Sequence, residues 1–333
     1  MSAATLDRLL AVLIGAQLLT GLLTLRAGSP PTAPLFVVHG VLGGALATAV
    51  VLKLRHSLPR AIAARRWGAI MLALALALAA SAALAGGFVW VASGRILSIG
   101  PWTILTIHVL AALTLVPIAI AHLVPRRWRV LRRPRRPAGT ALVSRRTALG
   151  MGALAAVGVV AWAASNAFDA LAGGVRRFTG SRWLPDGGVP PATTFFGEGT
   201  TPIDVQRWRL AVTGLVARPL DLSLADLAGL GEVERDEVLD CTSGWALRTT
   251  WRGVALGDVL AAAEVRDGAT RVVVRAVTGW FAELPLGEAR SALLATGVAG
   301  EALRHGNGAP CRLVAPDRRG LEWVKWVGEI EVA

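Results

Sequence analysis

The chain has 333 residues, of which 54% are hydrophobic, and a formal net charge of +13. The charge belongs to the first half. Up to Ser165 there are 16 Arg, one Lys and one acid, a balance of +16, and the remainder has 18 basic and 21 acidic residues, a balance of −3. Because the basic residues flank apolar runs, as in the loops of membrane proteins, no basic stripe remains for nucleic acid. Composition therefore excludes nucleic-acid binding and indicates a membrane part followed by a domain of ordinary composition.

Five apolar runs in the first half approach or exceed the roughly 18 residues that span a bilayer core. They are Leu9 to Leu25, Leu35 to Leu54, Trp67 to Ala92, Trp102 to Val124 and Thr147 to Ala164. We predict a bundle of four transmembrane helices in residues 1–125. An Arg-rich loop with a fifth, connecting helix (126–165) and a linker (166–182) should lead to a last domain (183–333).

The distribution of basic residues between the loops predicts the orientation in the membrane. The loops after the second and fourth runs hold most of the Arg residues, whereas the other two have only Arg26 and Arg95. Basic loops stay in the cytoplasm, so the N-terminus is expected there and the last domain on the extracytoplasmic face. We predict a multi-pass protein of the cell membrane, with the lipid bilayer as a partner.

The fifth run begins as a twin-arginine export signal would. Ser144, Arg145 and Arg146 open the segment SRRTALGMGALAAVGVVAWAAS, and such signals direct the export of folded domains. A domain usually folds before export because it has taken up a cofactor. The alternative is an ordinary helix with a basic flank, and Ala148 stands where the signal usually has Phe. We favour an uncleaved anchor, although residues 165–167 offer a loose cleavage site.

Four of the five His residues lie in the second and fourth runs. His39 and His108 are a few residues from the outer ends of their helices, so they should reach similar depth, as the axial ligands of a haem b do. His56 and His122 form a second pair about 25 Å and 21 Å further along, at 1.5 Å per residue. Imidazole in a bilayer is a functional candidate, and the inner pair offers a second haem site. The alternative is hydrogen bonding between helices.

Short β-rich runs and modest helices follow from about Trp183 onward. The runs RWRLAVTG, DEVLDC, RVVVRAV, CRLVAP and WVKWVGEIEV are predicted strands, and SLADLAGL is a predicted helix. The roughly 150 residues of this part suffice for one compact core. We therefore predict an α+β domain after the helical membrane part.

Three segments of this domain carry a resemblance to a known family. They are QRWRLAVTGLVARPLDLSLADLAGL, LDCTSGWALRTTWRGVALGDVL and NGAPCRLVAPDRRGLEWVKWVGEIEV. In this order they resemble the sulfite-oxidase-like molybdopterin oxidoreductases, in particular the periplasmic methionine sulfoxide reductase catalytic subunits. The first resembles the opening strand, turn and helix of that family, the second is similar to the segment that supplies the molybdenum's thiolate, and the third to the one that holds the pterin phosphate. The likeness covers nearly all of 193–332. It implies a molybdenum-molybdopterin cofactor and two-electron oxygen-atom transfer.

By this resemblance Cys241 is the molybdenum ligand, and a soft thiolate suits that role beside a pterin dithiolene. Cofactor contacts are expected at Thr193, Phe196, Asn307, Arg312, Trp323, Val324 and Lys325. Thr193 and Phe196 depart from the Asn and Tyr of the family. Lys325 suits a phosphate as a compact charge, and Arg312 offers a bidentate fork. The alternative for both cations is a salt bridge to Glu322 or Glu329.

The residues after Cys241 also bear on the substrate. They read TSGWAL, with no cation before Arg248, which suits a neutral oxo donor better than the sulfite dianion. We predict a membrane-anchored oxidoreductase that reduces a small sulfoxide or an oxidised protein side chain. Electrons would come from quinol or another redox partner through haem b. The alternatives are a sulfite dehydrogenase, or a metal-free binding module, which the changes at Thr193 and Phe196 favour. Cys311, in an apolar run, is interpreted as structural.

Overall fold

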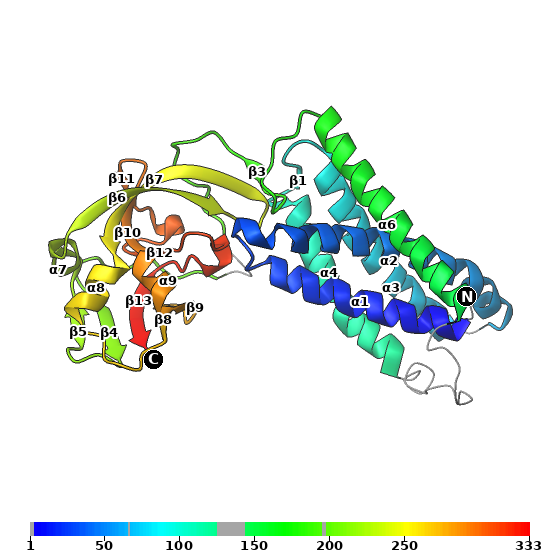
Figure 1. Ribbon diagram of the computed structural model, residues 1–333, viewed down its shortest axis with the longest axis horizontal. Helices are drawn as coiled ribbons and strands as arrows, with labels where there is room; N and C mark the ends of the chain where they lie inside the picture. Colours follow the sequence, from blue (N-terminus) through cyan, green and yellow to red (C-terminus); the bar gives the residue numbers. More distant parts are fainter. Residues whose placement is uncertain (1–2, 66, 125–143, 195–197) are drawn as a thin grey trace. The chain divides into compact units, whose positions relative to one another are not determined.

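The computed structural model describes residues 3–65, 67–124, 144–194 and 198–333, so Phe196 and most of the Arg-rich loop lie outside the described residues. The chain divides into two compact units (Figure 1). The helical unit comprises Met1–Thr24 and Pro31–Arg182, and the sheet unit comprises Leu25–Pro30 and Trp183–Ala333. The predicted α+β class is confirmed, because apolar helices come first and a sheet-rich domain follows.

Among the described residues, five helices of the helical unit are long and apolar enough to cross a membrane. They are α1 (Ala3–Thr24), α2 (Ala33–Ala63), α3 (Trp67–Ala92), α4 (Ile104–Leu123) and α6 (Arg145–Leu171). The 3-10 turn η1 (Pro30–Thr32) precedes α2, and the short hairpin of β1 (Ser98–Ile99) and β2 (Trp102–Thr103) precedes α4. The five helices are compatible with membrane anchoring.

Two helices run further than their apolar runs predict. Helix α2 continues through Pro59, and α6 continues to Leu171, so the first residues of the predicted linker are helical. The polar residues that suggested an earlier end to α6 are accommodated by local partners. Asn166 donates to the Trp162 carbonyl at 2.6 Å, and Asp169 pairs with two arginines.

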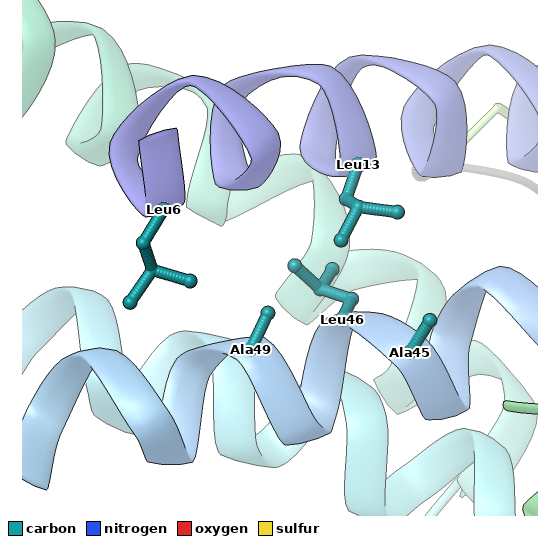
Figure 2. Close-up of a cluster of buried hydrophobic side chains, with 5 residues drawn as sticks. All are labelled: Leu6, Leu13, Ala45, Leu46 and Ala49. Atoms are coloured by element: carbon teal, nitrogen blue, oxygen red, sulfur yellow. The ribbon is translucent and has the colours of Figure 1, made fainter. Parts of the chain in front are cut away.

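Small and apolar side chains pack α2 against its neighbours. Leu6 and Leu13 of α1 form a buried cluster with Ala45, Leu46 and Ala49 of α2 (Figure 2). Helix α6 comes closest to α2 at Gly158, where an added Cβ would lie 2.3 Å from the Val41 carbonyl oxygen. Helices in lipid associate through such small residues, because their backbones can then approach closely.

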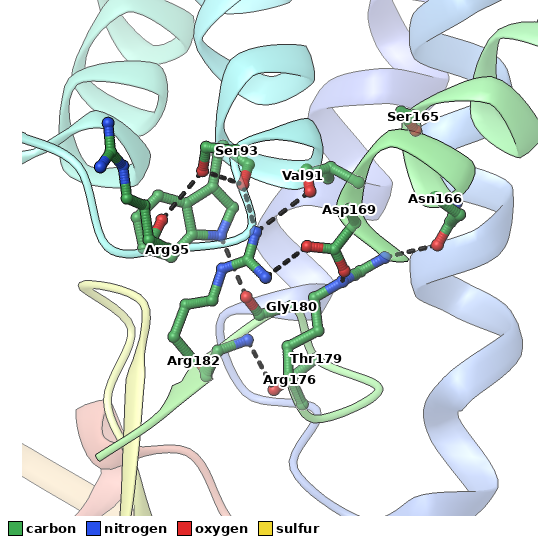
Figure 3. Close-up of polar contacts among 12 residues, drawn as sticks. Val91, Ser93, Arg95, Ser165, Asn166, Asp169, Arg176, Thr179, Gly180 and Arg182 are labelled. Atoms are coloured by element: carbon green, nitrogen blue, oxygen red, sulfur yellow. Dashed lines mark hydrogen bonds and ion pairs between the residues drawn. The ribbon is translucent and has the colours of Figure 1, made fainter. Parts of the chain in front are cut away.

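A buried ion-pair cluster joins the ends of α3 and α6 to the segment that follows α6 (Figure 3). Asp169 accepts from Arg176 at 2.7 Å and from Arg182 at 2.5 Å. Arg182 also donates to the last carbonyls of α3, at Trp90 (2.9 Å) and Val91 (3.1 Å). These carbonyls have no partner within their own helix, so Arg182 ties the end of α3 to α6.

Replacing Asp169 with Ala should destabilise the helical unit strongly. The Arg182 side chain is 3% exposed and would lose its counter-ion, and removing one partner of a buried ion pair costs about 3–5 kcal/mol. Thermal unfolding in detergent measures the effect. Asp7→Ala is the matched control, because the Asp7–Lys53 pair is about 30% exposed on both sides and such pairs contribute about 0–1 kcal/mol. Equal shifts for the two variants would contradict this account of the cluster.

The sheet unit contains two sheets. In the six-stranded sheet the order is β11 (Glu301–Ala302), β10 (Leu293–Val298), β7 (Trp245–Ala255) and β3 (Arg182–Trp183), with β12 (Arg312–Val314) on β10 and β6 (Glu232–Asp240) on β7. The five-stranded sheet has the order β5 (Leu220–Leu222), β4 (Leu210–Gly214), β13 (Val327–Val332), β8 (Arg271–Ala276) and β9 (Phe281–Pro285). Only the β4–β13 pairing within that sheet is parallel.

Short helices complete the sheet unit. They are α7 (Leu224–Gly229), α8 (Leu256–Ala262), α9 (Leu286–Ser291) and the 3-10 turns η3 (His305–Asn307) and η4 (Gly320–Glu322). Helix α7 starts with a capping box, in which Ser223 and Asp226 satisfy each other's backbone N–H groups. The first half of the run WVKWVGEIEV is not a strand as predicted. It forms the loop between η4 and β13, which brings Lys325 to the site described next.

Candidate active site

Cys241 lies in the turn of the β6–β7 hairpin. Its N–H donates to the Trp245 carbonyl (2.8 Å), and its carbonyl accepts from the N–H of Gly244 (3.0 Å). Gly244 has φ +103°, a conformation that other residues rarely adopt. The Cys241 residue is only 8% exposed. The turn therefore presents one thiol at the end of two long paired strands.

A second segment fixes the same backbone. Arg319 donates to the Cys241 carbonyl at 2.9 Å and forms a salt bridge with Asp240 at 3.3 Å. Both charged side chains are buried, so each satisfies the other. Gly320 lies against the turn as well, since an added Cβ there would be 3.3 Å from the Cys241 Cα. The hairpin turn and the segment of Arg319 and Gly320 thus both fix the position of the Cys241 thiol.

Two hydroxyl groups lie beside the sulfur of Cys241. The distances from Sγ are 3.0 Å to Ser243 Oγ and 3.4 Å to Thr193 Oγ1. Hydroxyls that donate to a thiolate favour its charged form. The Thr193 carbonyl also accepts from Lys325 Nζ at 2.5 Å. Thr193 therefore connects the cysteine turn with the closing segment of the chain.

Backbone carbonyls position the two cations of the closing segment. Lys325 Nζ donates to Gly306 (2.7 Å) as well as Thr193. Arg312 donates from Nη1 to the Asn307 carbonyl (3.0 Å) and from Nη2 to the Trp323 carbonyl (3.2 Å). The bonds fix both side chains in place without neutralising their charges.

The predicted alternative of salt bridges for these cations is wrong. Glu322 pairs with Arg318 at 2.9 Å, and Glu329 lies 3.9 Å from Arg275. Within the described residues, Arg312 and Lys325 form no ion pair with either glutamate. Their positive charges therefore stay available to another group.

The loop before β12 requires a glycine, because it passes between the side chains of these two cations. Gly308 has φ +106°, and an added Cβ would lie 3.0 Å from the Cβ atoms of both Arg312 and Lys325. Its neighbour Asn307 is 3% exposed and donates from Nδ2 to the Pro190 carbonyl at 2.9 Å. The side chain of Asn307 thus anchors the loop to Pro190, and the backbone carbonyl of Asn307 holds the Arg312 side chain in place.

Burial shapes the electrostatics of this site. Desolvation, and then the charge of Arg312, lower the pKa of Lys325 to about 8. Desolvation also lowers the pKa of Arg312 to about 10. Cys241 and Glu198 oppose both shifts, and Glu198 is held by a 2.8 Å bond from Thr278. Two poorly solvated cations beside a thiol suit an anionic ligand.

The two remaining predicted contacts, Trp323 and Val324, are buried, and their backbone carbonyls accept hydrogen bonds from Arg312 and Leu313. Trp323 and Val324 are each 1% exposed, and the Val324 carbonyl accepts from the Leu313 N–H at 2.7 Å. Cys311 precedes β12 and is fully buried, and burial raises the pKa of its thiol to about 12. It stays a neutral thiol, as a structural residue would.

In the helical unit, His39 of α2 and His108 of α4 lie together. Their ring centroids are 6.2 Å apart and their planes nearly perpendicular, at 89°. His56 is exposed on α2 and His122 half-buried on α4, and no contact joins these two among the described side chains. Within the described ranges, no three His, Cys, Asp or Glu side chains gather where they could hold a metal ion. The candidate metal positions are thus one thiol and one imidazole pair.

A pocket of about 610 Å³ lies elsewhere in the sheet unit. It is lined by residues that include Arg26, Arg271, Trp280, Arg318 and Glu322. Trp280 donates from Nε1 to the Leu321 carbonyl at 3.0 Å. Cys241 is not among the lining residues, so the structure does not join this pocket to the cysteine turn.

Sequence reasoning missed several groups of the site. Arg319, Asp240 and Glu198 lie among many other charged residues, and only the fold shows that they approach Cys241 or the two cations. Arg319 carried one usable signal, because it adjoins Gly320 in the run DRRGLEW, and a glycine in such a polar run indicates a turn.

Comparison with known proteins gives consistent matches to the sheet unit. The family described as "Oxidoreductase molybdopterin binding domain" matches residues 198–333. The chain is similar to "Uncharacterized oxidoreductase YuiH" of Bacillus subtilis, with 35% identity over 156 residues, 44% of this chain and 79% of that protein.

Two further relatives are named "Protein-methionine-sulfoxide reductase catalytic subunit MsrP". The one from Gluconobacter oxydans is 31% identical over 146 residues, which cover 38% of this chain and 46% of that protein. The one from Xanthomonas campestris is 34% identical over 141 residues, 37% and 44% of the two chains. The chain thus spans less than half the length of each MsrP.

Among solved structures, the chain is similar to the sulfane dehydrogenase SoxCD from Paracoccus pantotrophus, with a TM-score of 0.38, 26% identity and coverage of 40% of this chain and 39% of that one. The relationship to YuiH covers most of that protein, and the family match ends with the last residue of the chain. The chain is therefore an enzyme that belongs to the sulfite-oxidase-like family of molybdopterin oxidoreductases, and its sequence lies with the MsrP-like branch.

Proposed function

We propose that the sheet unit binds a molybdenum-molybdopterin cofactor through Cys241 and catalyses oxygen-atom transfer on a sulfoxide-type substrate. When bound, this cofactor supplies two-electron chemistry at the metal. The chain supplies the soft thiolate of Cys241, with Thr193 and Ser243 to donate hydrogen bonds to it. The observation that carries the proposal is that Thr193 connects this thiol with Lys325, and so with the cationic segment.

The residues present fit an anionic cofactor. Arg312 uses both Nη atoms on carbonyls, but its buried Nε has no partner in the described part of the structure. Lys325 has a lowered pKa of about 8 because it is desolvated, and a bound phosphate would reverse that effect. Asn307, Trp323 and Val324 would hold the loop around the cofactor.

The direction of reaction is proposed from the charges near the thiol. Reduction of a sulfoxide consumes two electrons and two protons and yields a sulfide and water, and a neutral substrate needs no cluster of free cations. Three Arg residues might have served a sulfite dianion, namely Arg271, Arg275 and Arg290. Arg290 lies on α9, whereas the other two lie on the five-stranded sheet and have carboxylate partners. Arg271 lies 3.5 Å from Glu283, and Arg275 lies 3.0 Å from Glu331. The name of the MsrP relatives agrees with this direction.

A sulfite dehydrogenase is the second candidate, and the sulfane dehydrogenase among the similar structures is an oxidising enzyme by name. The metal-free module is not proposed, because the chain belongs to a family of oxidoreductases. Thr193, which had favoured that module, places its hydroxyl at the thiol.

We propose that His39 and His108 bind a haem b in the helical unit. Two imidazoles bound to one metal at about 2 Å each have centroids roughly 6 Å apart, close to the observed 6.2 Å. His108 Nδ1 lies 2.6 Å from the Ala83 carbonyl, which only accepts, so Nδ1 carries the proton and Nε2 keeps its lone pair.

The surroundings of His39 lead to the same tautomer. Thr20 Oγ1 donates to the Ala16 carbonyl at 2.8 Å, so it accepts from His39 Nδ1 at 2.9 Å. His39 Nε2 then keeps a lone pair, which faces the amide of Gln17 at 3.3 Å. Metal-binding imidazoles commonly have their other nitrogen fixed in this way. Both rings therefore keep an unprotonated Nε2, and a metal bound to His39 would replace the Gln17 amide as the partner of that nitrogen.

The proposal also includes an electron donor, a second haem and the orientation of the chain in the membrane. A quinol in the bilayer would supply electrons one at a time through the haem, and His56 with His122 would hold a second haem. The Arg distribution supports a cytoplasmic N-terminus and an extracytoplasmic sheet unit. Arg145 and Arg146 begin α6, so a twin-arginine signal would be read from the cytoplasmic end of that helix.

The test of the proposed reaction uses the full chain in detergent, purified from a molybdate-fed host. Dithionite-reduced viologen supplies electrons, and methionine sulfoxide is the substrate. We expect viologen oxidation that requires the sulfoxide and no reduction of ferricyanide by sulfite. The opposite pattern would favour the sulfite dehydrogenase, and a molybdenum-loaded enzyme without either activity would refute both.

Retention of the cofactor should weaken as the pH rises above 8. A bound anion stabilises the protonated form of Lys325 and so raises its pKa above about 8, and binding then takes up a proton. Affinity is constant below pH 8 and falls up to about tenfold per pH unit above it. Molybdenum retained after dialysis at pH 7 to 10 measures this. Lys325→Arg should flatten the dependence, because Arg stays charged. An equal slope in both proteins would contradict the assignment.

A further inference from the structure

Three buried side-chain donors near the cofactor segment lack hydrogen-bond partners in the described part of the structure. They are Arg312 Nε, Trp251 Nε1 and Thr249 Oγ1. The residues are 3%, 0% and 2% exposed, so bulk water does not satisfy them. Buried polar groups are nearly always hydrogen-bonded in native proteins. Three exceptions in one place therefore need an explanation.

The three groups belong to one region. The guanidinium of Arg312 lies 5.2 Å from the centroid of the Trp251 ring and 5.9 Å from that of Trp323. The two tryptophan rings meet edge to face, with centroids 5.5 Å apart. Thr249 and Trp251 are two positions apart on β7, so their side chains project from the same face of the strand.

The charge of this region selects the ligand. Arg312 is fixed by carbonyls of Asn307 and Trp323, and Lys325 adds a second cation across Gly308. These three groups can each donate a hydrogen bond: a guanidinium N–H, an indole N–H and a hydroxyl. The unpartnered acceptor of the closing segment, Glu322 Oε2, belongs to a carboxylate that already pairs with Arg318. The set of three donors is complementary to an anionic ligand rich in acceptor atoms, as a phosphorylated heteroaromatic group is.

We infer that Trp251 and Thr249 are further binding residues for the molybdopterin cofactor, donating hydrogen bonds to its acceptor atoms beside Arg312. The inference rests on the proposed function. It differs from the contacts that the sequence resemblance implies, all of which come from the early segment, Cys241 or the closing segment. Strand β7 would then contribute to the cofactor site along its length and not only through the cysteine turn.

The variants Trp251→Phe and Thr249→Val separate binding from a structural role. Each removes one donor, so the cofactor-free protein loses no hydrogen bond. Thr249→Val keeps the side-chain shape, and we expect its melting temperature to be unchanged or higher, because an unsatisfied buried donor is removed. Trp251→Phe also removes part of a buried ring, so its melting temperature should fall, but by less than that of the control Trp208→Phe, which loses a hydrogen bond as well. Retention of molybdenum after dialysis of the loaded protein should fall about tenfold for each donor lost.

Trp208→Phe and Thr250→Val are the matched controls. Trp208 Nε1 donates to the Val327 carbonyl at 2.9 Å and Thr250 Oγ1 to Asp236 at 2.5 Å, so both controls break a bond within the chain. They should lower the melting temperature of the cofactor-free protein and leave molybdenum retention unchanged. A loss of molybdenum retention that the control does not show indicates a contact with the cofactor. A lower melting temperature with full molybdenum retention indicates a structural role.

Each remaining outcome overturns a stated claim. If Trp251→Phe and Thr249→Val retain molybdenum at the parental level, or lose it only as far as a control with the same fall in melting temperature, the inference is wrong and buried water satisfies the donors. A parental chain that takes up no molybdenum would overturn the proposed function, and this inference with it.

Discussion

Cys241→Ser should purify without molybdenum and without sulfoxide reductase activity. The protein offers one thiolate to the metal at this position, and a hydroxyl is a much weaker ligand for a soft site. The cofactor carries the chemistry, so activity should fall to the background of the assay rather than by a modest factor. Elemental analysis of the purified chain and the viologen assay measure the two losses independently.

The second cysteine provides the control for this experiment. Cys311 is fully buried, and burial raises the pKa of its thiol to about 12, so it is neutral at physiological pH. Cys311→Ala should therefore keep the parental molybdenum content, with a small loss of stability from the missing sulfur. Loss of molybdenum in Cys311→Ala, with retention in Cys241→Ser, would reverse the assignment.

His39→Ala and His108→Ala should each abolish the b-type band in a reduced-minus-oxidised spectrum of the chain in detergent. One imidazole from α2 and one from α4 lie with ring centroids 6.2 Å apart, and each is fixed through Nδ1, so each substitution removes one of the two residues that would hold the proposed haem. Methionine sulfoxide reduction with viologen should persist in both variants, because viologen can deliver electrons directly to the sheet unit.

His56→Ala tests the specificity of the haem assignment. His56 is exposed on α2, so its loss should leave the outer haem intact and remove at most a second component of the band. A parental chain with no b-type band after purification with haem supplied, or a parental band in His108→Ala, would show that the helical unit does not use this pair.

Length and hydropathy were enough to predict the helices but not their ends. A long apolar run has few other stable forms in a bilayer, so each of the five runs became a helix. The extension of α6 to Leu171 was missed because Asp169 is unfavourable in lipid unless it is paired. Its partners Arg176 and Arg182 come later in the chain, and their return to α6 depends on the tertiary fold.

The strands were harder to predict from the sequence than the site. In the central strand β7, buried residues alternate with more exposed ones from Leu247 to Gly253, but two of the buried positions hold Thr249 and Gly253 instead of large apolar residues. Periodicity could not identify it. The site residues were found through resemblance, and the structure brings Thr193, Cys241 and Lys325 together. The role of Arg319 depends on a long-range contact that no local pattern encodes.

X-ray absorption at the molybdenum edge tests the central claim most directly, because it counts the sulfur atoms bound to the metal. In the loaded parental chain we expect one sulfur ligand beyond the dithiolene pair, namely the Cys241 thiolate. Only the two dithiolene sulfur atoms at the metal, with the Cys241 thiol of the loaded parental chain open to alkylation, would contradict this claim.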